Sequence, residues 1–196
     1  MTRWKWIATF VFALGLALAP HTSAQSQPPT AQSAAPQTPA PPPPANSADV
    51  ASPSALLAAT YDVISGPAGQ KRDWDRFRSL CWSGARLIPT RANKDAAGFN
   101  ALVLTPEEYI TRVTPLFEKT SFFEIEAARR MERYGNIVQA FSTYESRHDP
   151  KEPPFQRGIK SFQLFFDGSR WWIISVFWQA ETPEYPIPKE FLPSGS

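Results

Sequence analysis

The sequence predicts an α+β domain in which three N-terminal helices pack on a curved, mainly antiparallel sheet of four to six strands. In three segments before Ser121, apolar residues recur at the spacing of helices. From Ser121 to about Glu181 they follow the two-residue period of strands. The dipeptides Gly135-Asn136 and Asp167-Gly168 interrupt this region and are typical of tight hairpin turns. Helices followed by an antiparallel meander favour a layered α+β fold.

The first 24 residues have the three parts of a secretory signal peptide. Arg3 and Lys5 precede an apolar run of 14 residues from Trp6 to Ala19, and small residues end the segment at Ala24. A helix that crosses a bilayer needs about 20 apolar residues, so a stable membrane span is not expected. We therefore expect cleavage after residue 24 and a periplasmic or secreted protein. An uncleaved, anchored form is the alternative.

Residues 25–50 consist mostly of Ala, Pro, Gln, Ser and Thr and contain no aromatic residue. Such a segment cannot bury enough apolar surface to offset the entropy lost on ordering. We expect a disordered, proline-rich spacer here, followed by one folded domain over residues 51–196.

Charge and rare residues exclude several classes of function. Without the signal segment, 18 basic residues stand against 18 acidic ones, so a nucleic-acid partner is not expected. Cys81 is the single cysteine, which rules out an intramolecular disulfide, and its apolar neighbours predict a buried, inert thiol. His148 is the single histidine after residue 24, so neither a His/Cys metal site nor a cofactor is expected.

Each predicted helix has a cap and an apolar stripe. Ser52-Pro53 begins the first helix and Gly66-Pro67 ends it. Asp73 caps the second, and Thr105 with Glu108 forms a capping box at the start of the third. The stripes are Leu56, Leu57, Thr60, Tyr61 and Ile64; Trp74, Phe77 and Cys81; and Tyr109, Val113, Leu116 and Phe117.

Four strands are expected after the helices, near Phe122–Arg133, Ile137–Arg147, Gly158–Phe166 and Trp171–Ala180. A two-residue turn at Asp167-Gly168 places Phe162, Leu164, Phe166, Trp171, Ile173, Ser175 and Phe177 on one face. It places Ile159, Phe165, Trp172, Ile174, Val176 and Trp178 on the other. Because both faces are apolar, the one without helices needs a cover. We expect a second subunit there, and the C-terminal segment Pro183–Pro193 is the alternative.

The same reasoning applied to the Gly135-Asn136 hairpin places Glu124, Glu126, Glu145 and Arg147 together on a wet face, and Arg129 on the apolar face with Tyr144. An arginine on an apolar face needs a partner, and a polar pocket or an anionic ligand would supply one.

The sequence resembles the nuclear transport factor 2-like superfamily, the SnoaL-like or cystatin-like α+β cone. The resemblance covers roughly residues 51–192 and rests on the three helices before the meander and on the segments Asp73–Leu80 and Asp167–Val176. It implies a pocket between the helices and the concave sheet face, and dimerisation through the sheet. Some members are isomerases, dehydratases or cyclases, whereas many others bind or assemble, so the fold does not choose a chemistry.

The residues expected to line the pocket are Trp74, Phe77, Tyr109, Arg129, Tyr144, Ser175 and Phe177, although the aromatic ones would equally suit a filled core. Isomerase-like members use an Asp or His base inside the cone, and here each Asp of the domain falls in a predicted helix, cap or loop. No catalytic residue is therefore assigned.

We expect an exported, non-catalytic domain that binds a small, partly apolar ligand or an envelope protein. The alternatives are a SnoaL-like isomerase, dehydratase or hydrolase that uses Tyr144, Arg129 or His148, and a structural module of the cell envelope.

Overall fold

The computed structural model describes residues 41–93 and 97–193, so the predicted signal segment lies outside the described part. The helices are α1 (Pro53–Ile64), α2 (Trp74–Leu80) and α3 (Pro106–Lys119), with a short 3₁₀ helix, η1 (Lys189–Phe191). The strands are β1 (Cys81–Ala92), β2 (Phe99–Ala101), β3 (Phe123–Tyr134), β4 (Ile137–Arg147), β5 (Gln156–Phe166) and β6 (Trp171–Ala180). No helix in the described ranges is long and apolar enough to cross a membrane.

The three predicted helix caps are confirmed. The Ser52 side chain accepts a hydrogen bond from the amide of Ala55, and the Asp73 side chain accepts one from the amide of Arg76. At α3, Thr105 and Glu108 form both hydrogen bonds of a capping box. These side chains satisfy amide groups that the first turn of a helix leaves without a partner.

The strands form one mixed sheet in the order β2-β1-β6-β5-β4-β3. The pair β1–β6 is parallel and the other pairs are antiparallel. The four predicted strands are confirmed to within two residues at each end, but β1 and β2 were not predicted. Gly84 and Pro89 interrupt the pattern of β1, and both residue types are depleted in strands.

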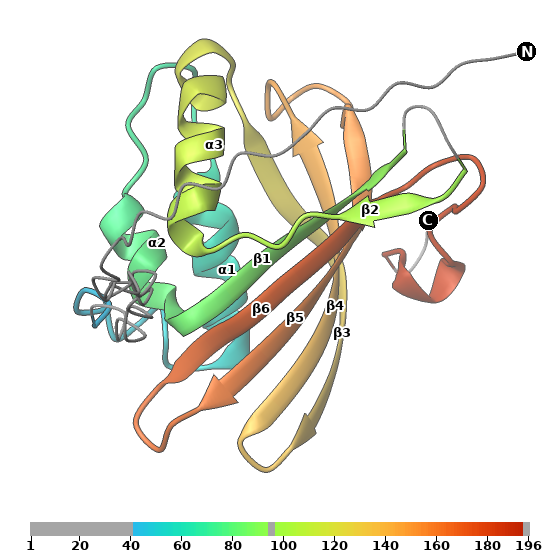
Figure 1. Ribbon diagram of the computed structural model, residues 1–196. Helices are drawn as coiled ribbons and strands as arrows, with labels where there is room; N and C mark the ends of the chain where they lie inside the picture. Colours follow the sequence, from blue (N-terminus) through green and yellow to red (C-terminus); the bar gives the residue numbers. More distant parts are fainter. Residues whose placement is uncertain (1–40, 94–96, 194–196) are drawn as a thin grey trace, which may run out of the picture. The chain divides into compact units, whose positions relative to one another are not determined.

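The three helices lie on one side of the sheet, and η1 lies on the other (Figure 1). The core fills the space between the helices and the sheet. Its fully buried members include Leu56 and Leu57 from α1, Phe162 from β5 and Ile173 from β6. The predicted α+β layering is therefore confirmed.

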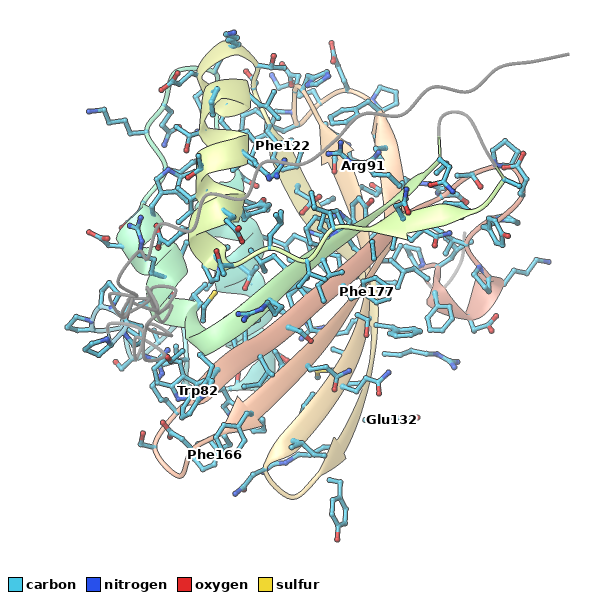
Figure 2. The ribbon with its side chains drawn as sticks, viewed as in Figure 1. Trp82, Arg91, Phe122, Glu132, Phe166 and Phe177 are labelled. Carbon is cyan, nitrogen blue, oxygen red and sulfur yellow. The ribbon has the colours of Figure 1, made fainter. Side chains whose placement is uncertain are left out.

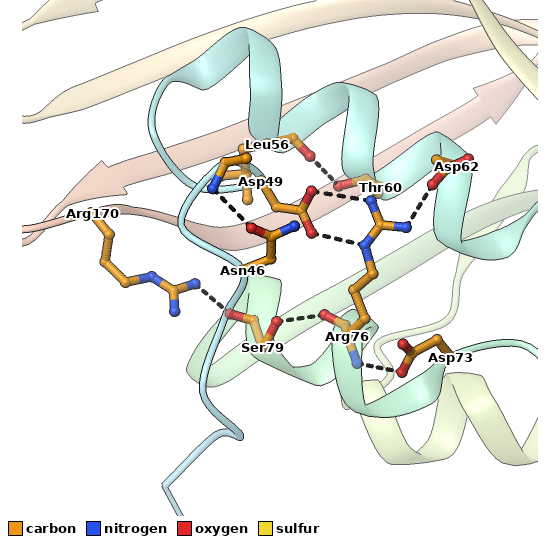
Figure 3. A network of polar contacts seen from close by, with 10 residues as sticks. Asn46, Asp49, Leu56, Thr60, Asp62, Asp73, Arg76, Ser79 and Arg170 are labelled. Carbon is orange, nitrogen blue, oxygen red and sulfur yellow. Dashed lines mark hydrogen bonds and ion pairs between the residues drawn. The ribbon is translucent and has the colours of Figure 1, made fainter.

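Packing extends back into the segment that the sequence assigned to the spacer. Asp49 and Val50 are buried, and the Val50 carbonyl accepts a hydrogen bond of 3.0 Å from the amide of Trp171. Arg76 joins Asp49, at 2.7 Å, to Asp62 of α1, at 2.5 Å (Figure 3). The folded part thus begins before Ala51, because Asp49 closes an ion pair with α2 and Val50 belongs to the core.

Two bulges change which side chains face the helices. In β6 the register passes from Leu164↔Ile173 to Gln163↔Ser175, so Ile174 is an extra residue. The alternation reverses beyond such a bulge. Val176 is consequently 4% exposed and Phe177 is 45% exposed.

The expectation that Ser175 and Phe177 face the helices is therefore wrong. In their place Val176 and Trp178 lie on the inner face, where the simple hairpin register had not put them.

The second bulge is in β3, where the register shifts between Glu126↔Tyr144 and Ala128↔Thr143. The predicted two-residue turn is confirmed, since Tyr134 pairs with Ile137. Ala127 is the extra residue of this bulge. On its N-terminal side the alternation is reversed, so Glu124 and Glu126 lie on the inner face, and Glu124 is buried. The prediction of a wet surface for these two glutamates is wrong.

The outer face is covered in part by the C-terminal segment. Phe191 of η1 packs on Phe141 of β4 with ring centres 5.5 Å apart. Beyond this contact, Trp82 meets both Phe165 and Trp172 edge to face, at 5.6 and 5.3 Å. Trp82, which is labelled in Figure 2, is 39% exposed. Part of the apolar outer face is thus covered by the tail, and an aromatic part remains accessible.

Candidate ligand-binding site

A recess of about 400 Å³ lies between α3 and the inner face of the sheet. We call it the α3–sheet recess. Its aromatic lining comes from Tyr109 of α3, Tyr144 of β4 and Trp178 of β6, and its polar lining includes Arg91, Arg112 and Gln156. Aliphatic residues of β1, of α3 and of the segment before α3 complete the lining. Volume and composition are those of a small-molecule pocket.

The aromatic residues of the recess rest on a deeper aromatic layer. Tyr109 meets Trp178 edge to face at 6.4 Å, and on the core side it stacks on Phe77 at 5.5 Å. Trp74 packs edge to face on Phe77 at 5.9 Å and stacks on Phe117. Among the predicted site residues, Tyr109 and Tyr144 therefore line the recess, whereas Trp74 and Phe77 support it from within the core.

Gly158 makes room for the buried ring of Tyr144. The two residues are paired across β4 and β5. A Cβ atom on Gly158 would lie 2.7 Å from the Tyr144 ring and hydroxyl and 2.2 Å from the carbonyl oxygen of Gln179. Glycine is therefore required at this position.

The Tyr144 phenol is a neutral hydrogen-bond donor. Burial raises its pKa well above the usual value of a tyrosine, and the nearby charge of Glu124 raises it further. Its hydrogen bond to Gln156 Oε1 is long, at 3.5 Å. This hydroxyl is therefore weakly engaged within the protein and suited to donate to a ligand.

A buried ion pair lies beside Tyr144 on the inner face. Lys160 Nζ bonds to Glu124 Oε1, and Ser146 Oγ donates to Glu124 Oε2 at 2.8 Å. The Lys160 side chain is 9% exposed and that of Glu124 is 5% exposed. The ammonium group also lies 4.7 Å from the ring centre of Tyr61 and 5.1 Å from that of Tyr144, within cation–π range.

Glu126 forms the second half of this polar cluster. It accepts a hydrogen bond of 2.6 Å from Ser142 Oγ and pairs with Arg129 at 2.9 Å. The hydroxyl groups of Tyr61 and Ser142 are 2.6 Å apart. Arg129 therefore has a partner within the chain, and it does not line the α3–sheet recess.

A second recess of about 460 Å³ lies between α1 and β3, and its lining includes Tyr61, Glu124 and Glu126. Both carboxylates are already held, each by one cation and one hydroxyl. Burial raises the pKa of the Tyr61 phenol, so this hydroxyl stays protonated at neutral pH. The arrangement is that of a satisfied buried network.

Sequence reasoning missed this cluster for two reasons. The β3 bulge that turns Glu124 and Glu126 inward carries no glycine or other recognisable signal. Lys160, in contrast, has the same parity as Phe162 and Leu164 in a regular part of β5, so alternation alone could have placed it inside.

His148 and Cys81 do not join either recess. His148 lies on the exposed loop after β4, where it stacks on Phe155 at 4.2 Å and its Nδ1 lies 3.0 Å from the Ser121 carbonyl oxygen. Cys81 is buried, and burial raises the pKa of its thiol to about 12. Over the ranges 41–93 and 97–193, no three His, Cys, Asp or Glu side chains gather as metal ligands would.

Comparison with known proteins gives matches among solved structures. No model of a known protein family matches the sequence, and no curated protein sequence matches it.

Two of the matching structures reach a TM-score of 0.50. A cystatin-like protein of unknown function from Nostoc punctiforme is 9% identical, over 65% of this chain and 87% of its own. A domain assigned as a calcium/calmodulin-dependent protein kinase type II association domain, from Thiobacillus denitrificans, is 12% identical over 72% and 99%. An NTF-2 like protein of unknown function from Silicibacter pomeroyi matches with a TM-score of 0.44 and 13% identity, over 67% and 94%.

At these identities the likeness concerns the fold alone. The chain therefore has the cystatin-like α+β fold, which is also called nuclear transport factor 2-like.

Proposed function

We propose that this domain binds a small, partly apolar molecule in the α3–sheet recess and does not transform it. The observation that carries the proposal is the buried, neutral phenol of Tyr144 in a recess of about 400 Å³ whose other aromatic residues are Tyr109 and Trp178. Apolar area supplies affinity in such sites, while a few polar groups orient the ligand.

The lining of the recess argues against acid–base catalysis. None of the described residues that line it is Asp, Glu, His, Cys or Lys. The nearest polar cluster holds its carboxylates in ion pairs, as given above. A general base must reach the proton that it removes, and among the described residues no carboxylate, imidazole, thiol or amine faces this recess.

The test is to fill the recess. Val113 lines it and is half-buried, so Val113→Trp places an indole where a ligand would lie. Glu118→Trp, on an exposed position of the same helix, is the matched control.

Native mass spectrometry of freshly purified protein should show a bound small molecule for the control and much less for Val113→Trp, at equal melting temperature. A wild-type protein that carries no bound mass, and whose recess amides do not shift on addition of aromatic fragments, would contradict the proposal.

We also propose that a second copy of the chain covers the accessible part of the outer face. Support comes from the contiguous aromatic side chains of Trp82, Phe165 and Trp172, together with the exposed Phe177, which the described tail does not cover. An apolar patch of this kind on a monomer is unusual, and a two-fold axis lets one face cover its own copy. If an envelope protein covers this face instead, light scattering should give the mass of a complex with that protein and not of a dimer.

Export remains a proposal that rests on the sequence of residues 1–24, which lie outside the described part. N-terminal sequencing of the periplasmic or extracellular protein should give a start near Gln25. Recovery of the intact N-terminus in the membrane fraction would indicate an anchored form.

A further inference from the structure

We propose that the ligand of the α3–sheet recess is a carboxylate with a flat apolar body, whose anionic group binds to Arg91 and Arg112. This inference rests on the proposed function and names the ligand class of the same site. The observation behind it is that most of the described arginine side chains have a partner within the chain, whereas two at the recess do not.

Arg91 and Arg112 are the exceptions. Neither guanidinium has a hydrogen bond, an ion pair or a ring contact with another residue in the described part of the chain. The other ten described arginines each have at least one such contact, with a carboxylate, a backbone carbonyl or a ring. Arg112 makes only a minor contribution to the lowered pKa of Glu108, after the hydrogen bonds of Thr105.

Both exceptions line the same recess, although they come from different elements. Arg91 lies near the end of β1, where it pairs with Asn100 of β2 (Figure 2). Arg112 lies on α3, three residues after Tyr109, and residues at this spacing are neighbours on a helix surface. Two cations that have no partner among the described residues therefore lie beside the aromatic residues of the recess.

The chemistry of the lining selects an anion over a cation. The guanidinium group is planar, stays charged at neutral pH and matches the two oxygens of a carboxylate. No acidic side chain among the described residues of the recess would repel such a group. The protonated hydroxyl of Tyr144 is a third donor for an oxygen atom, whereas a cationic ligand would face two positive charges.

The apolar part of the ligand follows from the walls. Tyr109 and Trp178 are edge to face with an interplanar angle of 85°, so the planes of the two rings in the lining are nearly perpendicular. A flat ring can stack on one of them and meet the other with its edge, which are the two favoured aromatic geometries.

Two probes of nearly equal shape separate the anionic contribution from the apolar one. We would titrate the purified protein with naphthalene-2-carboxylate and with naphthalene-2-carboxamide, using calorimetry and the amide chemical shifts of the recess residues. At about 20 mM salt the carboxylate should bind about tenfold more tightly, because two exposed charge pairs each contribute modestly. At 500 mM salt the difference should shrink, since screening weakens exposed charge pairs.

Three variants locate the effect. Arg91→Gln and Arg112→Gln should each weaken carboxylate binding about threefold and leave carboxamide binding unchanged. Arg86→Gln is the matched control, because it removes the same charge from an exposed position of β1 outside the recess, and it should leave both affinities unchanged.

The outcomes separate the two proposals. Equal affinity for the two probes, or equal losses in Arg86→Gln and Arg112→Gln, would overturn the anion site while leaving a binding recess. If neither probe shifts the recess amides, the anion site and the proposed function both fall.

Discussion

Replacing Lys160 by methionine should destabilise the protein severely, because it leaves the carboxylate of Glu124 buried without its cation. Methionine keeps most of the length and volume of the lysine side chain, so the change removes the charge with little loss of packing. Ser146 would still donate one hydrogen bond to Glu124. One hydrogen bond does not compensate the desolvation of a carboxylate whose side chain is 5% exposed.

The expected cost is about 3–5 kcal/mol, the range for breaking a buried ion pair by removing one partner. That is a large share of the roughly 5–15 kcal/mol that stabilises a typical domain. The double variant Lys160→Met/Glu124→Leu removes both charges and should lie within about 2 kcal/mol of the wild type, since apolar groups of similar volume often replace a buried pair at little cost. The two substitutions should therefore be strongly non-additive.

Urea unfolding followed by tryptophan fluorescence at pH 7 measures these free energies. Arg78→Met is the control, because the pairs of Arg78 with Glu107 and Asp75 are exposed, with carboxylate side chains that are 63% and 77% exposed, and their loss should cost only about 1 kcal/mol. A Lys160→Met variant as stable as Arg78→Met would refute the reasoning. So would a double variant whose cost equals the sum of the two single ones.

Three further predictions follow from the packing. Gly158→Ala should cost about 1–3 kcal/mol through overpacking against the Gln179 carbonyl oxygen and the Tyr144 ring. Tyr144→Phe, which loses one long hydrogen bond, should cost less than about 1 kcal/mol, and urea unfolding tests both variants. Light scattering should give a dimer mass for the wild type and the mass of a folded monomer for Trp172→Glu. Trp178→Glu, on the inner face, should unfold. A monomeric wild type at tens of micromolar, or a mass that fits only a complex with another protein, would contradict self-association. Cys81 should react with a thiol reagent only on unfolding. Because its pKa rises from 9.0 to about 12 in the fold, it favours the folded state at neutral pH, and this contribution should be lost as the pH rises from about 9 to 12; rapid labelling of native protein would contradict its burial.

The sequence was informative where one local rule decides the structure. The caps at Ser52, Asp73 and Thr105 and the two-residue turn at Gly135-Asn136 were found, because each depends on a few neighbouring residues. The hairpin at Asp167-Gly168 was also found, but the prediction of a two-residue turn there is wrong. Phe166 pairs with Trp171, so the loop has four residues, and the pairing is shifted by two residues without exchanging the faces. The strand β1 was missed for the opposite reason. Its pairing with β6 is parallel and joins residues about 90 positions apart, as in Ile88↔Phe177, so no local signal reports it.

The site was harder to predict because a bulge changes the face of the sheet on which every side chain beyond it lies. Tyr109 and Tyr144 lie on the inner side, next to the α3–sheet recess, as the α3 periodicity and the regular part of β4 predict. Ser175 and Phe177 do not, because one extra residue at Ile174 exchanges them with Val176 and Trp178. Nothing in a run of β-branched and aromatic residues marks which of them is the extra one.

These two bulges also account for the separation of the inner face into a polar cluster and an apolar recess. The bulge at Ala127 brings Glu124 and Glu126 inward, where Lys160 and Arg129 neutralise them. The bulge in β6 turns Trp178 inward as part of the recess lining. With strict alternation, the two glutamates would face outward and leave Lys160 buried without its anion. The recess would also lose its largest aromatic side chain. The irregular positions, more than the regular ones, therefore shape the recess in which we propose that a ligand binds.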